Sequence, residues 1–159
     1  MTPIYQFDGI LLKREDQNTT GSAKDRAIQA QVDHLSSQNF HQAVISSTGN
    51  AAISAYHFCQ SKNINLHIFI SPKIDQKKLI HLQSSNLHFS PKPISQAIKF
   101  AKTNSAYLLR PATDPVAIKA YGQIGREILS QQPRATSIFV AAGSGATYLG
   151  IRQSLPSHI

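Results

Sequence analysis

Residues 43–52 read Ala43-Val44-Ile45-Ser46-Ser47-Thr48-Gly49-Asn50-Ala51-Ala52. The first three are apolar and β-prone, which is typical of a buried strand, and a helical pattern begins at the end of the segment. Hydroxyls, a glycine and free backbone N–H groups at the start of a helix make a site for a carboxylate or phosphate. The same residue types are ordinary helix caps, so this segment alone leaves both interpretations open.

Outward from this segment, strand-like and helical patterns alternate along the chain. Apolar runs that predict strands occur at residues 10–12, 43–45, 66–70, 106–109 and 137–141. Helical spacing appears between them, at residues 28–35, 53–59, 79–82 and 116–129. This alternation predicts an α/β fold with mostly parallel sheets and helices on both faces. Ligands of such folds bind at the carboxyl ends of the strands, so the loops after strands are the candidate sites.

The loop after residues 10–12 runs into a helical pattern and contains Lys24 at about the first turn of that helix. The positive end of a helix disfavours a nearby ammonium group. An uncharged lysine amine in such a place can attack an aldehyde and form an imine. The alternative is a surface lysine near a cap, with Ser22 as the N-cap residue.

A third loop follows the predicted strand at residues 137–141 and reads Ala142-Gly143-Ser144-Gly145-Ala146-Thr147. Small residues let the backbone approach phosphate oxygens, and the hydroxyls of Ser144 and Thr147 can donate hydrogen bonds. No Gly-Lys-Ser/Thr follows, so it is not a P-loop, and the glycine spacing is a poor dinucleotide fingerprint.

Composition narrows the class of protein. A chain of 159 residues with 41% hydrophobic and 15% charged residues is typical of a soluble globular protein. No apolar run approaches the length of a membrane helix, and we expect a cytoplasmic protein without a membrane partner. The net charge of +8 is dispersed, so a nucleic-acid partner is not expected, although a basic RNA-binding α/β module is one alternative. Cys59 lies among apolar residues and is expected to be a buried free thiol.

Together the three loops resemble one known family. Asn18-Thr19-Thr20-Gly21-Ser22-Ala23-Lys24-Asp25-Arg26 resembles the cofactor-lysine segment of the fold-type II pyridoxal-phosphate enzymes, the tryptophan synthase β-like superfamily. Residues 47–50 look like the substrate-carboxylate loop of that family, and residues 143–147 look like its glycine-rich phosphate loop. Order and approximate spacing agree across nearly the whole chain, and three matches are more specific than one.

The resemblance implies a role for each matching residue. Lys24 would be the catalytic residue that carries pyridoxal 5'-phosphate covalently and later transfers protons. Ser47, Thr48 and Asn50 would contact the carboxylate of a small amino-acid substrate, and Asn50 would also lie beside the cofactor. The phosphate would be held by Gly143, Ser144, Gly145, Ala146 and Thr147. Asp25 and Arg26 would orient the lysine helix, and no metal is expected.

The resemblance leaves the reaction open. Residues 109–115, followed by Ala120-Tyr121-Gly122, resemble threonine synthase. This resemblance implies a pyridoxal-phosphate (PLP)-dependent lyase that converts O-phosphohomoserine to threonine. Residues 12–16 are shared with dehydratases, so threonine or serine dehydratase and cysteine synthase activities are the alternatives. Arg110 in the first of these segments has a second interpretation, as the partner of an acidic residue in a turn. A protein without catalysis, which keeps only the anion sites, is the rival class.

The resemblance also predicts the domain organisation. Residues 1–32 and 111–159 would be parts of a large cofactor-binding domain, and residues 33–110 a small α/β domain, so that the fold contains two open, mostly parallel sheets. The family continues well past the phosphate loop, whereas this sequence ends twelve residues after Thr147. We therefore expect an incomplete large domain here and a homodimer when the protein is complete.

Overall fold

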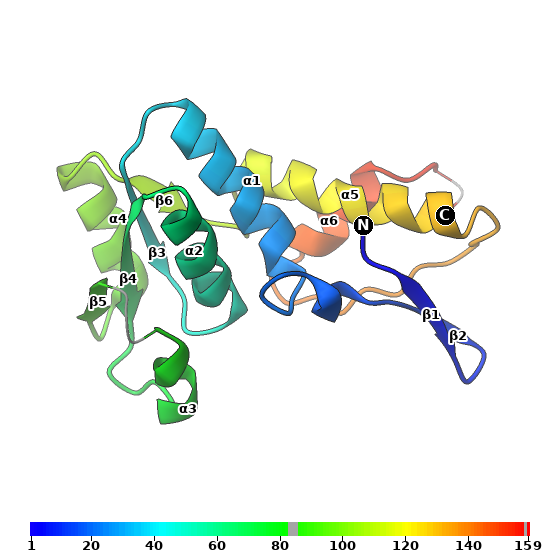
Figure 1. Ribbon diagram of the computed structural model, residues 1–159, viewed down its shortest axis with the longest axis horizontal. Coiled ribbons are helices and arrows are strands. Elements are labelled where there is room, and N and C mark those ends of the chain that lie inside the picture. The colour runs from blue at the N-terminus through cyan, green and yellow to red at the C-terminus, as the bar shows by residue number, and fades with distance from the viewer. Residues whose placement is uncertain (83–85, 158) are drawn as a thin grey trace.

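The computed structural model describes residues 1–82, 86–157 and 159. Helices cover the parallel sheet, and the hairpin of the first two strands projects away from them at the other end of the molecule (Figure 1). In chain order the elements are β1 (Ile4–Phe7), β2 (Ile10–Lys13), η1 (Glu15–Gln17), α1 (Lys24–Ser37), β3 (Gln42–Ser46), α2 (Asn50–Ser61), β4 (Asn65–Ile70), α3 (Gln76–Leu79), η2 (Ile80–Leu82), β5 (Asn86–Phe89), α4 (Pro93–Thr103), β6 (Tyr107–Leu109), α5 (Pro115–Gln131) and α6 (Ala146–Gln153).

The parallel sheet has the strand order β5-β4-β3-β6. All three strand pairs are parallel, and Ile45 of the central strand β3 lies opposite Ile68 of β4 and Leu109 of β6. Parallel strands need cover on both faces. One face packs against α1 and α2, where Ala43 and Ile45 are buried, and the other packs against α4, where Val44 meets Ala97. The predicted α/β class with a parallel sheet is therefore confirmed.

The two sides of the molecule meet along α1 (Figure 1). Its residues Ile28, Val32 and Leu35 belong to the core under the sheet, whereas Ala27 belongs to a second core built mainly from α5 and α6. Because the two sides of α1 pack on different cores, the helix that begins at Lys24 is held from both directions. Cys59 is 1% exposed in the first core, as expected, and burial raises the pKa of its thiol to about 12.

The predicted strand at residues 137–141 is wrong. These residues form no regular structure, and the Phe139 side chain is 98% exposed. A parallel strand forms only when a neighbouring strand pairs with its backbone, and none among the described residues lies alongside this segment. Within the described residues, the second sheet is only the antiparallel hairpin of β1 and β2.

Other differences are smaller. The helical pattern at residues 79–82 is divided between α3 and η2, and β1, β5 and α4 were not expected from the sequence. Helix α6, which follows the third loop, packs closely against α5. No helix among the described residues is long and apolar enough to cross a membrane.

Candidate active site

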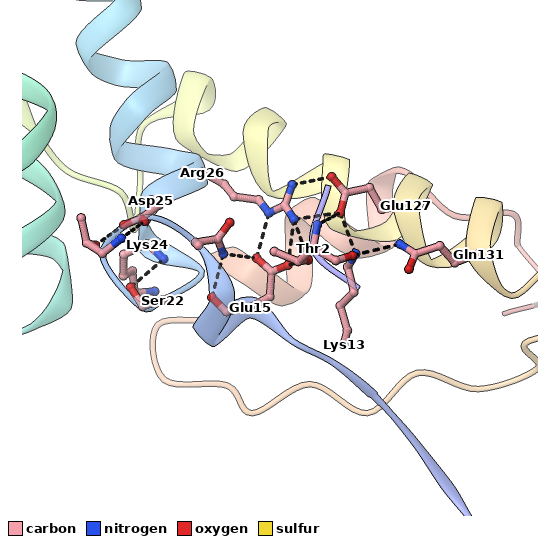
Figure 2. Close-up of polar contacts among 11 residues, drawn as sticks. Thr2, Lys13, Glu15, Ser22, Lys24, Asp25, Arg26, Glu127 and Gln131 are labelled. Carbon is pink, nitrogen blue, oxygen red and sulfur yellow. Dashed lines mark hydrogen bonds and ion pairs between the residues drawn. The ribbon is translucent and has the colours of Figure 1, made fainter. Parts of the chain in front are cut away.

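Lys24 is the first residue of α1 and is half-buried. The N-cap residue of α1 is Ala23 and not Ser22, although the backbone N–H of Lys24 donates a hydrogen bond of 3.2 Å to the Ser22 hydroxyl (Figure 2). The side-chain amine donates to the hydroxyl of Tyr121 at 3.2 Å, and its nitrogen lies 5.3 Å from the centre of the same ring. Tyr121 belongs to α5 and is completely buried. The amine is therefore held at one place by a rigid phenol.

Asp25 fixes the loop that precedes Lys24 to the neighbouring helix α2. Its buried carboxylate accepts a hydrogen bond from the backbone N–H of Thr20 at 2.6 Å and one from the hydroxyl of Thr20. It also accepts one from the hydroxyl of Ser54 on α2 at 2.5 Å. Because α2 starts with the second candidate loop, this carboxylate links the lysine loop to the loop predicted to bind substrate.

Arg26 forms the centre of a charged cluster on the other side of α1 (Figure 2). Its guanidinium bonds two oxygens of Glu15 at 2.8 Å each and both oxygens of Glu127 at 2.7 and 2.8 Å. Lys13 reaches Glu127 at 2.6 Å, and the Thr2 hydroxyl donates to Glu15 at 2.6 Å. The predicted orienting role of Asp25 and Arg26 is consistent with these contacts, because both anchor α1 by its first turn.

The ion pairs shift the pKa values of the two carboxylates. Burial alone would raise the pKa of Glu127, but hydrogen bonds from Arg26 and Lys13 outweigh it and lower the pKa to about 2. Burial likewise opposes ionisation of Glu15, and bonds from Arg26, Thr2 and Asn18 lower its pKa overall. Both carboxylates are therefore ionised at neutral pH and act as anchors, not as acids.

The second candidate loop lies between β3 and α2. Ser47 and Thr48 are partly exposed, Gly49 is the N-cap residue of α2, and Asn50 is its first residue and is exposed. The backbone N–H of Gly49 faces the Ser47 hydroxyl at 3.4 Å, which is a weak contact. The backbone N–H of Ala52 donates to the carbonyl of Gly49, whereas the hydroxyls and the N–H groups of Asn50 and Ala51 have no acceptor among the described residues and are available to a ligand.

The third candidate loop ends where α6 begins. Gly143 and Ser144 are exposed, and Gly145 is the N-cap residue with φ of 82°, a left-handed conformation that favours glycine. Ala146 is buried, and Thr147 lines a cavity of about 770 Å³ together with Ala23, the neighbour of Lys24. The structure therefore brings this loop and the lysine loop to one cavity, although 117 to 129 positions separate residues 18–26 from residues 143–147.

Both loops leave space for a bound anion beside the backbone. A Cβ atom built on Gly49, Gly143 or Gly145 would meet no atom within 4 Å. The first turns of α2 and α6 carry N–H groups without partners in the helix and the positive ends of the helix dipoles. An amine at Lys24 for an aldehyde and a helix start for a phosphate are the two features that pyridoxal phosphate requires, so the residues present fit that cofactor.

The chain belongs to the pyridoxal-phosphate dependent enzymes, because the model of that family matches residues 1–157. It is 26% identical over 159 residues to the catabolic L-threonine dehydratase TdcB of Staphylococcus aureus, in an alignment that covers 93% of this chain and 45% of that protein. The chain thus spans less than half the length of this curated relative.

Solved structures show the same fold. The processed form of threonine deaminase isoform 2 from Solanum lycopersicum matches with a TM-score of 0.87 and 21% identity, over 96% of this chain and 49% of the other. A cysteine synthase from Entamoeba histolytica matches with a TM-score of 0.87 and 19% identity, over 96% of this chain and 53% of the other. The two solved structures are each less than 25% identical to this chain and show the fold alone. The match to TdcB does not specifically support the threonine synthase interpretation and agrees better with the dehydratase alternative.

Sequence reasoning missed two residues of the site. Tyr121 was noticed only as part of a resemblance, and its contact with Lys24 joins residues 97 positions apart. Glu127 carried no signal, because its partner Arg26 is 101 positions away and a glutamate in a helix is ordinary. A fully buried tyrosine facing a lysine becomes visible only after α1 and α5 are packed.

Proposed function

We propose that the protein to which these residues belong catalyses pyridoxal-phosphate dependent elimination from a small amino acid that carries a β-hydroxyl or a substituted β-oxygen. The observation that carries the proposal is the placement of Lys24 at the start of α1 in a chain whose curated relative is a threonine dehydratase. The likeness to a cysteine synthase supports the same first stage of the reaction, in which a group leaves the β-carbon of the amino acid.

Each group in the site has one task in this proposal. Bound cofactor would supply an electron sink for the carbanion that forms when the α-proton leaves. Lys24 would hold the cofactor and then, released from it, accept and return a proton at its Nζ atom. Tyr121 would keep that nitrogen in place, because its own ring is fixed by burial.

The loops at residues 47–50 and 143–147 would orient the substrate and the cofactor. Ser47 and Thr48 would donate their hydroxyls to the substrate carboxylate, and Asn50 would contact both substrate and cofactor. The phosphate would bind at the start of α6, where Gly145 permits close approach and Thr147 can donate a hydrogen bond. Such fixed hydrogen bonds hold the α-C–H bond in the orientation that elimination requires.

The test uses the protein expressed from its complete reading frame and loaded with pyridoxal phosphate. Elimination predicts equal amounts of a 2-oxo acid and ammonia from serine, threonine or O-phosphoserine, and Lys24→Ala should abolish both. Release of phosphate and threonine from O-phosphohomoserine, with no 2-oxo acid from any of these substrates, would instead establish the threonine synthase reaction. Sulfide-dependent cysteine formation would establish the cysteine synthase reaction.

A further inference from the structure

A second, smaller cavity lies at the carboxyl ends of β3 and β6. It has a volume of about 230 Å³, and its walls come from the ends of these strands and from the first turns of α2 and α4. Its apolar wall includes Ile45, Ala97 and Leu109. Ser47 and Arg110 also line it, so a predicted substrate residue and an arginine without an assigned role share one cavity.

This cavity lies where the order in which strands are added to the sheet reverses. The chain passes from β3 to β4 and β5 in one direction, and it then returns to add β6 on the other side of β3. The direction of winding therefore reverses between β3 and β6. In open α/β sheets, ligands bind outside the carboxyl ends of the strands at such a reversal.

The charges around the cavity favour an anion. The side chain of Arg110 is exposed and makes no hydrogen bond or ion pair with any of the residues that the structure describes. Asp114, the nearest acid in sequence, instead accepts from Gln31 at 2.6 Å and from Tyr107 at 2.7 Å. No aspartate or glutamate lines the cavity, and α2 and α4 both begin at this edge of the sheet with the positive ends of their dipoles.

The alternative interpretation of Arg110 was a partner for an acidic residue in a turn. The structure argues against it for the described residues, because the carboxylate of Asp114 is occupied by Gln31, Tyr107 and the backbone N–H of Val116. An unpaired guanidinium beside an apolar wall is suited to a ligand with a short carbon chain and an anionic end, because guanidinium binds carboxylate and phosphate in the same two-pronged way.

We propose that this cavity receives the side chain of the amino-acid substrate and that Arg110 selects side chains ending in an anionic group, a carboxylate or a phosphate monoester. The inference rests on the proposed function, in which Ser47 binds the α-carboxylate of the same substrate. The apolar wall would contact the carbon chain, while Arg110 would bind the charged end.

Equilibrium binding to the cofactor-free protein tests this, because no turnover occurs without cofactor. Calorimetry would compare L-aspartate with the isosteric neutral L-asparagine, and O-phospho-L-serine with L-serine. Two charge-assisted hydrogen bonds predict a preference of about 10- to 100-fold for the anionic member of at least one pair. The pair that shows it identifies carboxylate or phosphate as the group selected.

Three variants make the result specific. Arg110→Gln should remove the preference, and Arg110→Lys should keep part of it because the charge remains. Lys102→Gln removes a charge from the last turn of α4, away from the cavity, and should leave the preference unchanged. Equal binding of both pairs by the wild type, or a preference that survives in Arg110→Gln, would overturn the inference. Failure of 2-oxo acid formation would concern the proposed reaction alone, since binding is measured separately.

Discussion

Arg26 connects three segments that are distant in sequence. Its guanidinium binds Glu15 in η1 and Glu127 in α5, while its own backbone belongs to the first turn of α1. The Arg26 side chain is 7% exposed and that of Glu127 is 5% exposed, so water screens their attraction weakly. The position of Lys24, two residues earlier, therefore depends on a buried charged cluster as well as on apolar packing.

Replacing Glu127 with Gln should destabilise the protein strongly. The variant leaves Arg26 and Lys13 buried without one of their anionic partners, a change that typically costs about 3–5 kcal/mol in buried pairs. Urea unfolding at pH 7 measures the free energy of unfolding. Asp16→Asn is the matched control, because Asp16 is exposed and its ion pair with the partly exposed Arg14 is open to water, and it should cost about 1 kcal/mol or less.

The same cluster predicts a dependence of stability on pH. The pKa of Glu127 is lowered from 4.5 to about 2 in the folded state, so its contribution is fully present above about pH 4.5. It should disappear as the pH falls from about 4.5 toward 2, because folded and unfolded states then bind the same proton. The difference in unfolding free energy between wild type and Glu127→Gln should thus narrow over this interval, and a constant difference down to pH 2 would refute the assignment.

The loop residues of the candidate site could be chosen from the sequence, whereas the residues that they contact from distant parts of the chain could not. Lys24, Ser47 and Gly143 stand in short segments whose order and spacing are visible in the sequence. Their roles as site residues stay predictions. The contact of Lys24 with Tyr121 depends on how α1 packs on α5, which no local pattern encodes.

Helices α5 and α6 approach each other closely at Gly150. A Cβ atom on Gly150 would lie 2.3 Å from the carbonyl oxygen of Ile118 and 2.6 Å from the Cβ atom of Tyr121. Glycine is therefore needed there for the helices to approach, and α6 carries Thr147 at its start. The same contact places the ring that holds Lys24 beside the helix predicted to bind phosphate.

Gly150→Ala should separate these helices and lower the free energy of unfolding by about 1–3 kcal/mol, because overpacking forces backbone shifts. Gly143→Ala is the control for stability, since a Cβ atom there would meet no atom within 4 Å. Thermal unfolding of both variants measures the difference. Equal melting temperatures would show that α5 and α6 pack less closely than described.

Local signals explain which elements were predicted. Helices α1, α2 and α5 have clear apolar periodicity, and strands β3 and β4 are short apolar runs. The missed strand β1 has a signal in retrospect, because Asp8 and Gly9 both have positive φ and Asp-Gly is a strong hairpin turn. Residues 137–141 show the reverse case. Their apolar run is a local signal for a strand, but a strand forms only beside a neighbouring strand, and none among the described residues pairs with them.

The whole molecule combines a well-covered sheet with an apolar surface open to solvent. Phe7 in β1, Ile10 in β2 and Phe139 are 70%, 62% and 98% exposed, and Ile10 and Phe139 line the larger cavity together with Ile4 of β1. The two main cores lie on opposite sides of α1. The proposed division into residues 33–110 and the flanking segments stays a prediction, as does a homodimer.

Hydrogen exchange on the 159-residue protein should follow this distribution of burial. Amides of β3 and β4 should exchange slowly, because they lie in the centre of the sheet and are covered on both faces. Residues 137–143 should exchange fast, because no strand among the described residues pairs with them. Helix α6 should be intermediate, since Ile151 is buried against α5. Slow exchange at residues 137–143 in a monomer would contradict this description.

Reductive labelling tests directly whether Lys24 is the residue that carries pyridoxal phosphate. The protein from the complete reading frame is loaded with cofactor, reduced with borohydride and digested, and its peptides are mapped by mass spectrometry. We predict the reduced cofactor on Lys24, with no label in Lys24→Ala and normal labelling in the control Lys102→Gln. Label on another lysine, or none while bound cofactor is demonstrated independently, would contradict it.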